Sequence, residues 1–440
     1  MRKTLHSDNQ GTTILLKTNQ PEKMKRLKDY SEDIYKCTKC GFCQAICPIY
    51  KETGLETAVS RGKFTLLHGI LNGRVDFTPK IAKYLDMCLG CRACYDFCPA
   101  GISAEEIITA ARNENFRINS ISLLKKFIIW CFKSNIRLKL LKFALDIYKK
   151  SGLIPVVDKI SGFSGRPGKL VQVFNQQLKE NIQYKKLTPV RENSGIKVAY
   201  FPGCIGSYVN PSAKNAVIMV LEKHGVEVIM PKNLSCCGIS SRSAGDYETF
   251  RALAEKNLRA IPSDINYLIT DCASCGSAWE FYPEFFEGEL KQKAEEISRK
   301  AVNINKFLDE TNLYIPEGTQ LKESVTYHDP CHLARFQRVT EEPRNILKKI
   351  PGIDYREMEE ADICCGAAGT FCVSKPGISL AISKRKAQNV INTEAGVVST
   401  SCSACKIGLA NGLVDSNTRK KLISPVELLA KLYIQEEKGT

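Results

Sequence analysis

Short apolar runs alternate with amphipathic stretches in the second half of the chain. Lys197–Phe201 and Val226–Met230 are runs typical of short buried strands. Between them an apolar stripe predicts a helix that is capped by Asn210, begins at Pro211 and ends at Gly225. The stripe consists of Ala213, Ala216, Val217, Val220 and Leu221. A strand, a helix and a strand in this order predict a βαβ unit with a parallel sheet.

The same pattern recurs further along the chain. Tyr267–Thr270 predicts another strand of the first unit, and Ser324–His328 and Val397–Thr400 hold the equivalent places in a second unit. We therefore expect an internal duplication of an α/β unit.

Helical spacing prevails in the first 115 residues. Ser103 to Glu106 has the capping-box pattern that begins a helix. Residues 1–30 are polar, and we expect no regular structure there. Two earlier groups of apolar residues also repeat at helical spacing: Leu66, Leu67, Ile70 and Leu71, then Ile81, Tyr84 and Leu85.

A basic segment separates these two parts. Residues 115–195 hold 16 Lys and Arg against 4 Asp and Glu, which is +12 of the chain's formal +16. One predicted helix places Leu123, Phe127, Trp130 and Cys131 on one side. Such a helix suits a membrane interface with anionic lipid, or a linker that packs on protein. No nucleic-acid-binding module is recognisable, so we expect no nucleic acid partner.

The composition is that of a globular protein, and the 440 residues leave room for about three domains. The polar start and the absence of an apolar run near ~20 residues favour a cytoplasmic location, peripheral on the membrane at most. In that compartment the 20 cysteines indicate metal sites rather than disulfides. The fold class we predict is α plus α/β. It comprises a helical domain (1–115), a basic helical linker (116–195) and two cysteine-rich α/β domains (196–320 and 321–440).

The first candidate metal sites are two matching runs of four cysteines, each followed by proline. This is the spacing of two-cluster bacterial ferredoxins, in which the fourth cysteine of each run ligates the other cluster. Two full matches make a pair of zinc ribbons a poor alternative. The predicted ligand sets are Cys37, Cys40, Cys43 and Cys98 for one [4Fe–4S] cubane, and Cys88, Cys91, Cys94 and Cys47 for the other.

The second candidate sites are a five-cysteine frame used twice, once in each α/β domain. Its first copy is Cys204, Cys236, Cys237, Cys272 and Cys275, and its second is Cys331, Cys364, Cys365, Cys402 and Cys405. Five thiolates from three loops suit an iron–sulfur cluster better than zinc, which normally takes four ligands. Adjacent cysteines can reach one site only through a tight turn, which Gly238 and Gly366 permit. We expect one or two further iron–sulfur clusters in these frames, with four or five sulfurs bound to each.

Two histidines and two cysteines lie near or outside these frames. His328 and His332 flank Cys331, and each is a candidate proton donor or, more simply, a hydrogen-bonding residue. Cys131 is expected in a core, and Cys372 is structural or an extra sulfur near the second frame.

With both motif sets placed, the chain resembles a family of iron–sulfur oxidoreductase subunits. Residues 198–430 resemble the cysteine-rich CCG domains of one subunit of heterodisulfide reductase. Residues 37–110 resemble another subunit of that enzyme, which holds two cubanes in a helical ferredoxin. The fused order is similar to the iron–sulfur subunits of glycolate oxidase and of anaerobic glycerol-3-phosphate dehydrogenase.

Individual motifs refine this resemblance. Ser60-Arg61-Gly62-Lys63 and the run from Cys364 to Thr370 look closest to glycolate oxidase. Many such relatives lack a cysteine in the first frame, whereas both frames are complete here, as in heterodisulfide reductase.

The resemblance implies [4Fe–4S] centres in both frames, noncubane where all five cysteines bind. It also implies an electron-transfer subunit that takes electrons from a FAD-dependent dehydrogenase for glycolate, lactate or glycerol 3-phosphate. The acceptor would be a quinone or another carrier. The alternatives are a catalytic subunit that reduces a disulfide at the CCG clusters, and a redox sensor without turnover.

Overall fold

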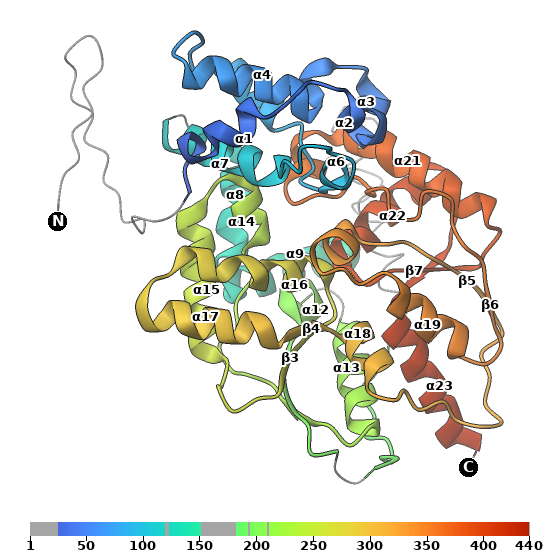
Figure 1. The fold of residues 1–440 in the computed structure, drawn as a ribbon. Helices are drawn as coiled ribbons and strands as arrows, with labels where there is room; N and C mark the ends of the chain where they lie inside the picture. The colour runs from blue at the N-terminus through green and yellow to red at the C-terminus, as the bar shows by residue number, and fades with distance from the viewer. Residues whose placement is uncertain (1–24, 119–122, 151–181, 192–193, 209–210, 440) are drawn as a thin grey trace.

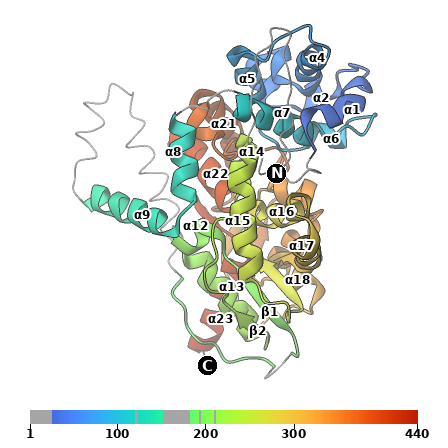
Figure 2. The same cartoon turned by 90° about the vertical axis from the view of Figure 1, so that its left-hand side faces the viewer.

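The computed structural model describes residues 25–118, 123–150, 182–191, 194–208 and 211–439 of the chain. A helical N-terminal part packs on one end of two α/β units, and the C-terminal helix lies at the opposite end (Figures 1 and 2). The predicted fold class is therefore confirmed, with a helical ferredoxin region followed by two parallel α/β sheets.

Helices and 3-10 turns build the N-terminal part, as the spacing predicts. The elements are η1 (Leu27–Tyr30), α1 (Ser31–Tyr35), α2 (Phe42–Ile46), α3 (Pro48–Thr53), η2 (Glu56–Ala58), α4 (Ser60–Leu71), α5 (Pro79–Leu85), α6 (Ala93–Asp96) and α7 (Ala104–Ile118). Leu67 of α4 and Leu85 of α5 are buried in one core with the apolar face of α7. The expectation that residues 1–30 have no regular structure is wrong for the last four, because Leu27–Tyr30 form η1. Leu27 and Tyr30 of this turn enter the core.

The first α/β unit is a four-stranded parallel sheet in the order β2-β1-β3-β4. The predicted strands are present, and α13 begins at Pro211 with Gly225 just beyond its end at a φ of +70°. Asn210, the predicted cap, lies outside the described residues. The elements are β1 (Lys197–Phe201), α12 (Gly203–Tyr208), α13 (Pro211–Lys223), β2 (Glu227–Ile229), α14 (Ile239–Ala244), α15 (Tyr247–Ala260), β3 (Tyr267–Thr270), α16 (Ala273–Phe281), η3 (Tyr282–Phe285), α17 (Gly288–Lys300), β4 (Ala301–Asn303) and α18 (Ile304–Glu310).

The second unit repeats this topology with the order β6-β5-β7-β8, again all parallel. Its elements are β5 (Glu323–Tyr327), η4 (His332–Phe336), α19 (Glu341–Lys349), β6 (Ile353–Tyr355), α20 (Phe371–Ser374), α21 (Pro376–Asn392), β7 (Val397–Ser399), α22 (Ser403–Asp415), β8 (Lys421–Ile423) and α23 (Pro425–Gly439). Apolar residues of both units share a core, so the duplicated units form one body.

Two helices of the basic segment are described, α8 (Leu123–Phe132) and α9 (Asn135–Lys150). In Figure 2, α8 runs beside α14 and α9 projects outward from the body. Cys131 is buried, as expected, whereas Leu123, Phe127 and Trp130, which the sequence places on the same side of this helix, are exposed. Among the described residues, no helix has the length and apolar content to span a bilayer.

Charged residues join the N-terminal part to the α/β body. Glu105 of α7 pairs with Arg242 of α14 (Oε1 to Nη1, 2.5 Å), and both side chains are less than a tenth exposed. Burial alone would raise the pKa of Glu105, but the charges of Arg242 and Arg92 outweigh it and lower that pKa. Next to this pair, Asn113 donates a hydrogen bond to the Gly245 carbonyl oxygen at 2.8 Å.

We predict that Glu105→Gln destabilises the chain by about 3–5 kcal/mol, because it leaves the Arg242 guanidinium buried without its countercharge. Anaerobic urea unfolding of the full chain measures the change. The matched control is Asp33→Asn, which breaks the exposed pair between Asp33 and Lys36 and should cost less than about 1 kcal/mol. Equal unfolding curves for the two variants would contradict the importance of the buried pair.

Candidate metal centres

The cysteines of the α/β units lie where parallel strands end. Cys204 and Cys272 follow β1 and β3, and Cys402 follows β7. Loops at the carboxyl edge of a parallel sheet converge, so cysteines in these loops can approach one another. The backbone there is shaped for close sulfur approach. Gly203 has a φ of +65°, and a Cβ at that position would lie 2.6 Å from the Cys275 sulfur.

The two adjacent cysteine pairs turn as the sequence predicts. Gly238 and Gly366 have φ values of +81° and +85°, which non-glycine residues rarely adopt. The amide of Gly238 donates to the Cys236 sulfur, and that of Gly366 to the Cys364 sulfur, each at 3.5 Å. Backbone donors of this kind stabilise thiolate sulfur.

The five thiols of the first frame form a continuous row, in which Cys204 is half-buried and the other four are buried. Hydrogen-bonding contacts connect Cys204 to Cys236, Cys236 to Cys237, Cys237 to Cys275, and Cys275 to Cys272. Hydrogen bonds from Cys204 and Cys237 lower the pKa of Cys236 well below its ordinary value. The structure therefore brings together all five residues that the sequence singled out.

The second frame repeats the arrangement in the same order: Cys331 contacts Cys364, Cys364 contacts Cys365, Cys365 contacts Cys405, and Cys405 contacts Cys402. All twenty cysteines of the chain are free thiols, so neither frame is closed by a disulfide. Soft sulfur donors at this density are the ligand set that iron–sulfur clusters take.

The two frames meet through their Cys-x-x-Cys segments. The sulfurs of Cys272 and Cys402 lie 4.0 Å apart, and Ser274 Oγ is 3.4 Å from the Cys402 sulfur. A backbone hydrogen bond from the Ala273 amide to the Ser401 carbonyl oxygen (2.9 Å) fixes this junction. Ten sulfurs therefore lie in one uninterrupted row across both α/β units.

The first ferredoxin site is an open recess in the N-terminal part. Cys37, Cys40 and Cys43 line it together with Cys98, which comes from the other motif, as the predicted ligand exchange requires. Cys40 is exposed, so this recess faces the surface. The donor set and the room fit a [4Fe–4S] cubane.

The second ferredoxin site is buried deeper. Burial raises the pKa of Cys94 to about 12. The hydrogen bond from Ser60 lowers this pKa, and the charges of the Cys88 and Cys47 thiols raise it. Ser60 Oγ donates to the Cys94 sulfur at 3.2 Å.

The remaining cysteine of this set, Cys91, connects the N-terminal part to the second frame. After burial, the charge of Cys331 is the largest contribution that raises the pKa of the Cys91 thiol. Cys91 and Cys331 also border one small apolar cluster with Cys364, in which α3 packs on α21 (Figure 1). The ferredoxin site and the second frame are thus direct neighbours.

The sequence did not single out Lys63 as a functional residue, although it lies in the run that resembles glycolate oxidase. Lys63 is fully buried, and its ammonium donates to the Ala58 carbonyl oxygen. Burial lowers the pKa of Lys63, while the Cys88 and Cys47 thiols act in the opposite direction. The sequence alone does not indicate this burial, because the Cys88 and Cys47 thiols near Lys63 come from other segments of the chain.

The residues outside the frames have distinct surroundings. His332 Nδ1 lies 2.5 Å from Ser277 Oγ, and its ring stacks on Phe336 at 4.5 Å. His328 is fully buried beside Cys365 and Cys405. Cys372 is half-buried, and its pKa is raised by burial and then by the charge of Cys365.

Family models match both parts of the chain. A 4Fe–4S dicluster domain matches residues 33–102, and a cysteine-rich CCG domain matches residues 198–279 and 325–410. These matches define the class of the protein: an iron–sulfur protein with one dicluster domain and a duplicated CCG domain.

Curated relatives share this organisation. The probable glycolate oxidase iron–sulfur subunit of Bacillus subtilis (strain 168) is 27% identical over 400 residues, covering 87% of this chain and 89% of the relative. The glycolate oxidase iron–sulfur subunit of Escherichia coli (strain K12) is 24% identical over 384 residues (85% and 89%). One subunit of the dihydromethanophenazine:CoB–CoM heterodisulfide reductase of Methanosarcina acetivorans is 26% identical over 404 residues (86% and 88%). The chain belongs to this family of iron–sulfur oxidoreductase subunits.

We predict that Cys91→Ser lowers the iron content of the anaerobically purified chain by about four atoms, because it removes one ligand of one [4Fe–4S] cubane. Chemical iron and sulfide determination checks this. Cys131→Ser is the matched control: it changes a buried cysteine outside the four candidate sites and should leave the iron content unchanged. Equal iron loss in both variants would contradict the assignment of Cys91.

Proposed function

We propose that this chain is the electron-transfer subunit of an oxidoreductase complex, with a FAD-dependent dehydrogenase as its partner. The observation that carries the proposal is the order of the candidate sites. The recess around Cys40 opens to solvent, the second ferredoxin site adjoins the second frame at Cys91 and Cys331, and the two frames meet at Cys272 and Cys402. Bound clusters would supply one-electron redox chemistry at each of these positions.

The residues of the chain would bind the clusters, bury them and set the spacing between them. We propose the eight ferredoxin cysteines as ligands of two cubanes and the two five-cysteine frames as ligands of two further [4Fe–4S] centres. Of the twenty cysteines, all in described segments, only Cys40 in the first recess is exposed. The aromatic side chains of Phe42 and Phe97 next to the recess cysteines are more than half exposed. This end is the proposed contact surface for the flavoprotein, because exposed aromatic residues favour protein interfaces.

The substrate class follows from the relatives. Two of them are named as glycolate oxidase iron–sulfur subunits. We therefore propose a 2-hydroxy acid such as glycolate or lactate, or glycerol 3-phosphate, as the substrate of the partner. Oxidation of this substrate releases two electrons and two protons. A quinone takes up these electrons and protons at the end of the series of sites opposite the flavoprotein.

The test uses the tagged chain, captured anaerobically with its flavoprotein. Addition of glycolate, lactate or glycerol 3-phosphate should bleach the visible absorbance of the iron–sulfur centres, and a quinone should restore it. Cys40→Ser should slow the bleaching while leaving flavin reduction by the substrate intact. Bleaching by none of these substrates would contradict the proposed partner class.

The alternative function is reduction of a disulfide at the paired frames. The specific observation in its favour is the 4.0 Å contact between Cys272 and Cys402, with both frames complete. The step would consume one disulfide, two electrons and two protons and release two thiols, with the electrons coming from the flavoprotein. Thiol release from a disulfide by the reduced chain, without any quinone, would favour this function over the electron-transfer function.

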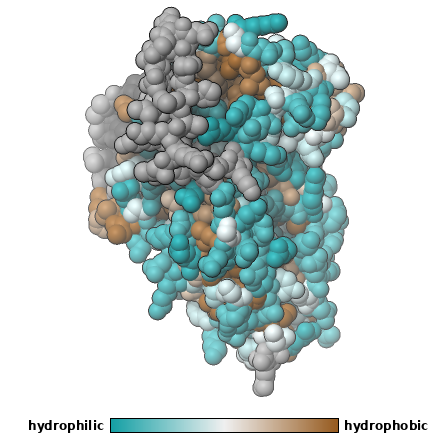
Figure 3. All heavy atoms as spheres, turned by 60° about the vertical axis from the view of Figure 1, so that its left-hand side comes forward, coloured by the Kyte–Doolittle hydropathy of each residue, from teal (hydrophilic) through white to brown (hydrophobic). Residues whose placement is uncertain are grey.

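An apolar surface on α8 and α9 suits contact with a membrane. Ile136, Leu140, Phe143 and Ile147 repeat at helical spacing on α9, and each is more than half exposed. Lys126, Lys133, Lys139 and Arg137 belong to the same two helices or the turn between them. In Figure 3 apolar surface is visible at the left-hand edge, at the level that α9 occupies in Figure 2. We propose that this surface, Leu123 to Ile147, binds anionic lipid.

We predict that replacing Leu140 and Phe143 with Glu weakens binding to phosphatidylglycerol-containing vesicles at least about tenfold, because apolar burial and charge attraction are both reduced. Vesicle co-sedimentation measures the change. Leu55→Glu, at an exposed apolar residue of the N-terminal part, is the matched control and should bind like the unchanged chain. Unchanged vesicle binding with lost capture of the flavoprotein would instead assign this surface to the partner.

A further inference from the structure

The two five-cysteine frames differ at one equivalent position. Three residues before the first cysteine of each frame stand Phe201 in the first unit and His328 in the second. Phe201 is buried in the core, edge-on to the Trp279 ring at 5.3 Å. His328 is equally buried but brings a nitrogen donor to a site that otherwise consists of sulfur.

His328 is held in one orientation by its surroundings. Its backbone amide donates to the Ser399 carbonyl oxygen at 2.9 Å, which extends the pairing of β5 with β7 by one residue. Its ring Nδ1 lies 3.0 Å from the Ala361 carbonyl oxygen. Because a carbonyl oxygen can only accept a hydrogen bond, Nδ1 carries the proton.

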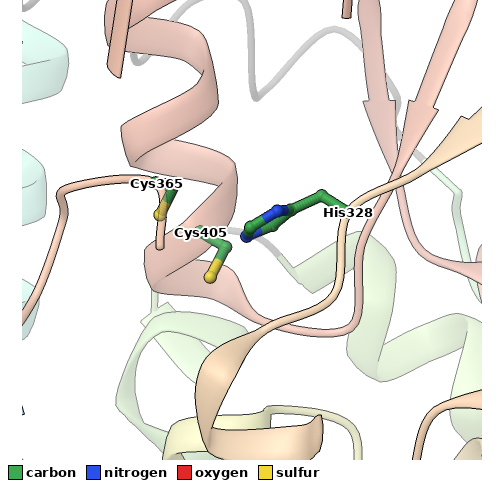
Figure 4. Close-up of side chains that lie close together, drawn as sticks. All are labelled: His328, Cys365 and Cys405. Carbon is green, nitrogen blue, oxygen red and sulfur yellow. The ribbon is translucent and has the colours of Figure 1, made fainter. Parts of the chain in front are cut away.

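This bond determines what the other ring nitrogen can do. With the proton on Nδ1, the neutral ring has a free lone pair on Nε2, and this buried nitrogen has no hydrogen-bond partner among the described residues. The His328 nitrogen and the sulfurs of Cys365 and Cys405 all lie within 4.8 Å of one another (Figure 4). Metal-binding histidines characteristically donate their other N–H to a carbonyl or carboxylate in this way.

We propose that His328 Nε2 is a metal ligand of the second CCG site, next to Cys365 and Cys405. The second site then has mixed nitrogen and sulfur donors, whereas the first frame offers sulfur alone. The buried lone pair makes His328 a ligand rather than the proton donor that the sequence suggested as one option. A neutral imidazole adds no negative charge, and histidine ligation raises the potential of iron–sulfur centres relative to thiolate ligation. Where the imidazole takes the place of one of the five thiolates at the iron, the second site should have the higher reduction potential of the two frames.

The test is pulsed EPR on the anaerobically reconstituted full chain, grown with ¹⁵N-labelled histidine. The chain has five histidines, so the label is sparse. We expect a strong histidine ¹⁵N coupling to one iron–sulfur centre, which His328→Phe abolishes while one centre shifts to lower potential. The matched control is His332→Gln, which removes the neighbouring, half-buried histidine and should keep the coupling.

A second variant covers the case in which His328→Phe does not fold. His328→Cys supplies a sulfur ligand in place of the nitrogen, so iron content should persist while the ¹⁵N coupling is lost. Full iron content without histidine coupling in the unchanged chain, or coupling that persists in His328→Phe, would overturn this inference alone. The inference rests on the proposed function, so a second frame without iron would overturn both.

Discussion

The constraint on which this structure depends is the gathering of ten thiols, eight of them buried, in one row. Thiols that share a dry environment cannot all ionise. Hydrogen bonding to a neighbouring thiol (Cys236 for Cys204, Cys365 for Cys405) and then burial raise the pKa values of Cys204 and Cys405 well above the ordinary value. Iron removes this conflict, since a cluster compensates the charge of several thiolates at once. The loops that end at Gly238 and Gly366 have a backbone shape that few residues other than glycine adopt. This geometry lets the two adjacent cysteines of each loop reach one site.

The duplication gives these sites a continuous order. Because both units have the same parallel topology, their cysteine-bearing edges can face one another, and the contact between Cys272 and Cys402 is the result. The N-terminal part packs on the second unit in the place where Cys91 approaches Cys331. The buried pair of Glu105 and Arg242 and the hydrogen bond from Asn113 hold it in that position. The contact that packs the N-terminal part on the second unit is thus also the contact that brings two candidate metal sites together.

Much of the fold and of the site could be predicted from sequence, for local reasons. The strand at 267–270 and the helix that begins at Pro211 have strong apolar patterns, and the cysteine spacings define the frames without any knowledge of the fold. The strands β4 and β8 were not predicted, because each has three residues and forms through pairing with a neighbour, such as Ala301 with Leu268. The approach of Cys272 to Cys402, the burial of Lys63 and the orientation of His328 depend on contacts between distant segments. No local pattern encodes such contacts.

The most direct test of the central claim is the metal and sulfide content of the anaerobically purified full chain, read together with its ⁵⁷Fe Mössbauer spectrum. Four occupied sites predict about sixteen iron atoms and a matching amount of acid-labile sulfide per chain. About eight iron atoms, with the CCG cysteines free to react with an alkylating reagent or filled by zinc, would contradict the account.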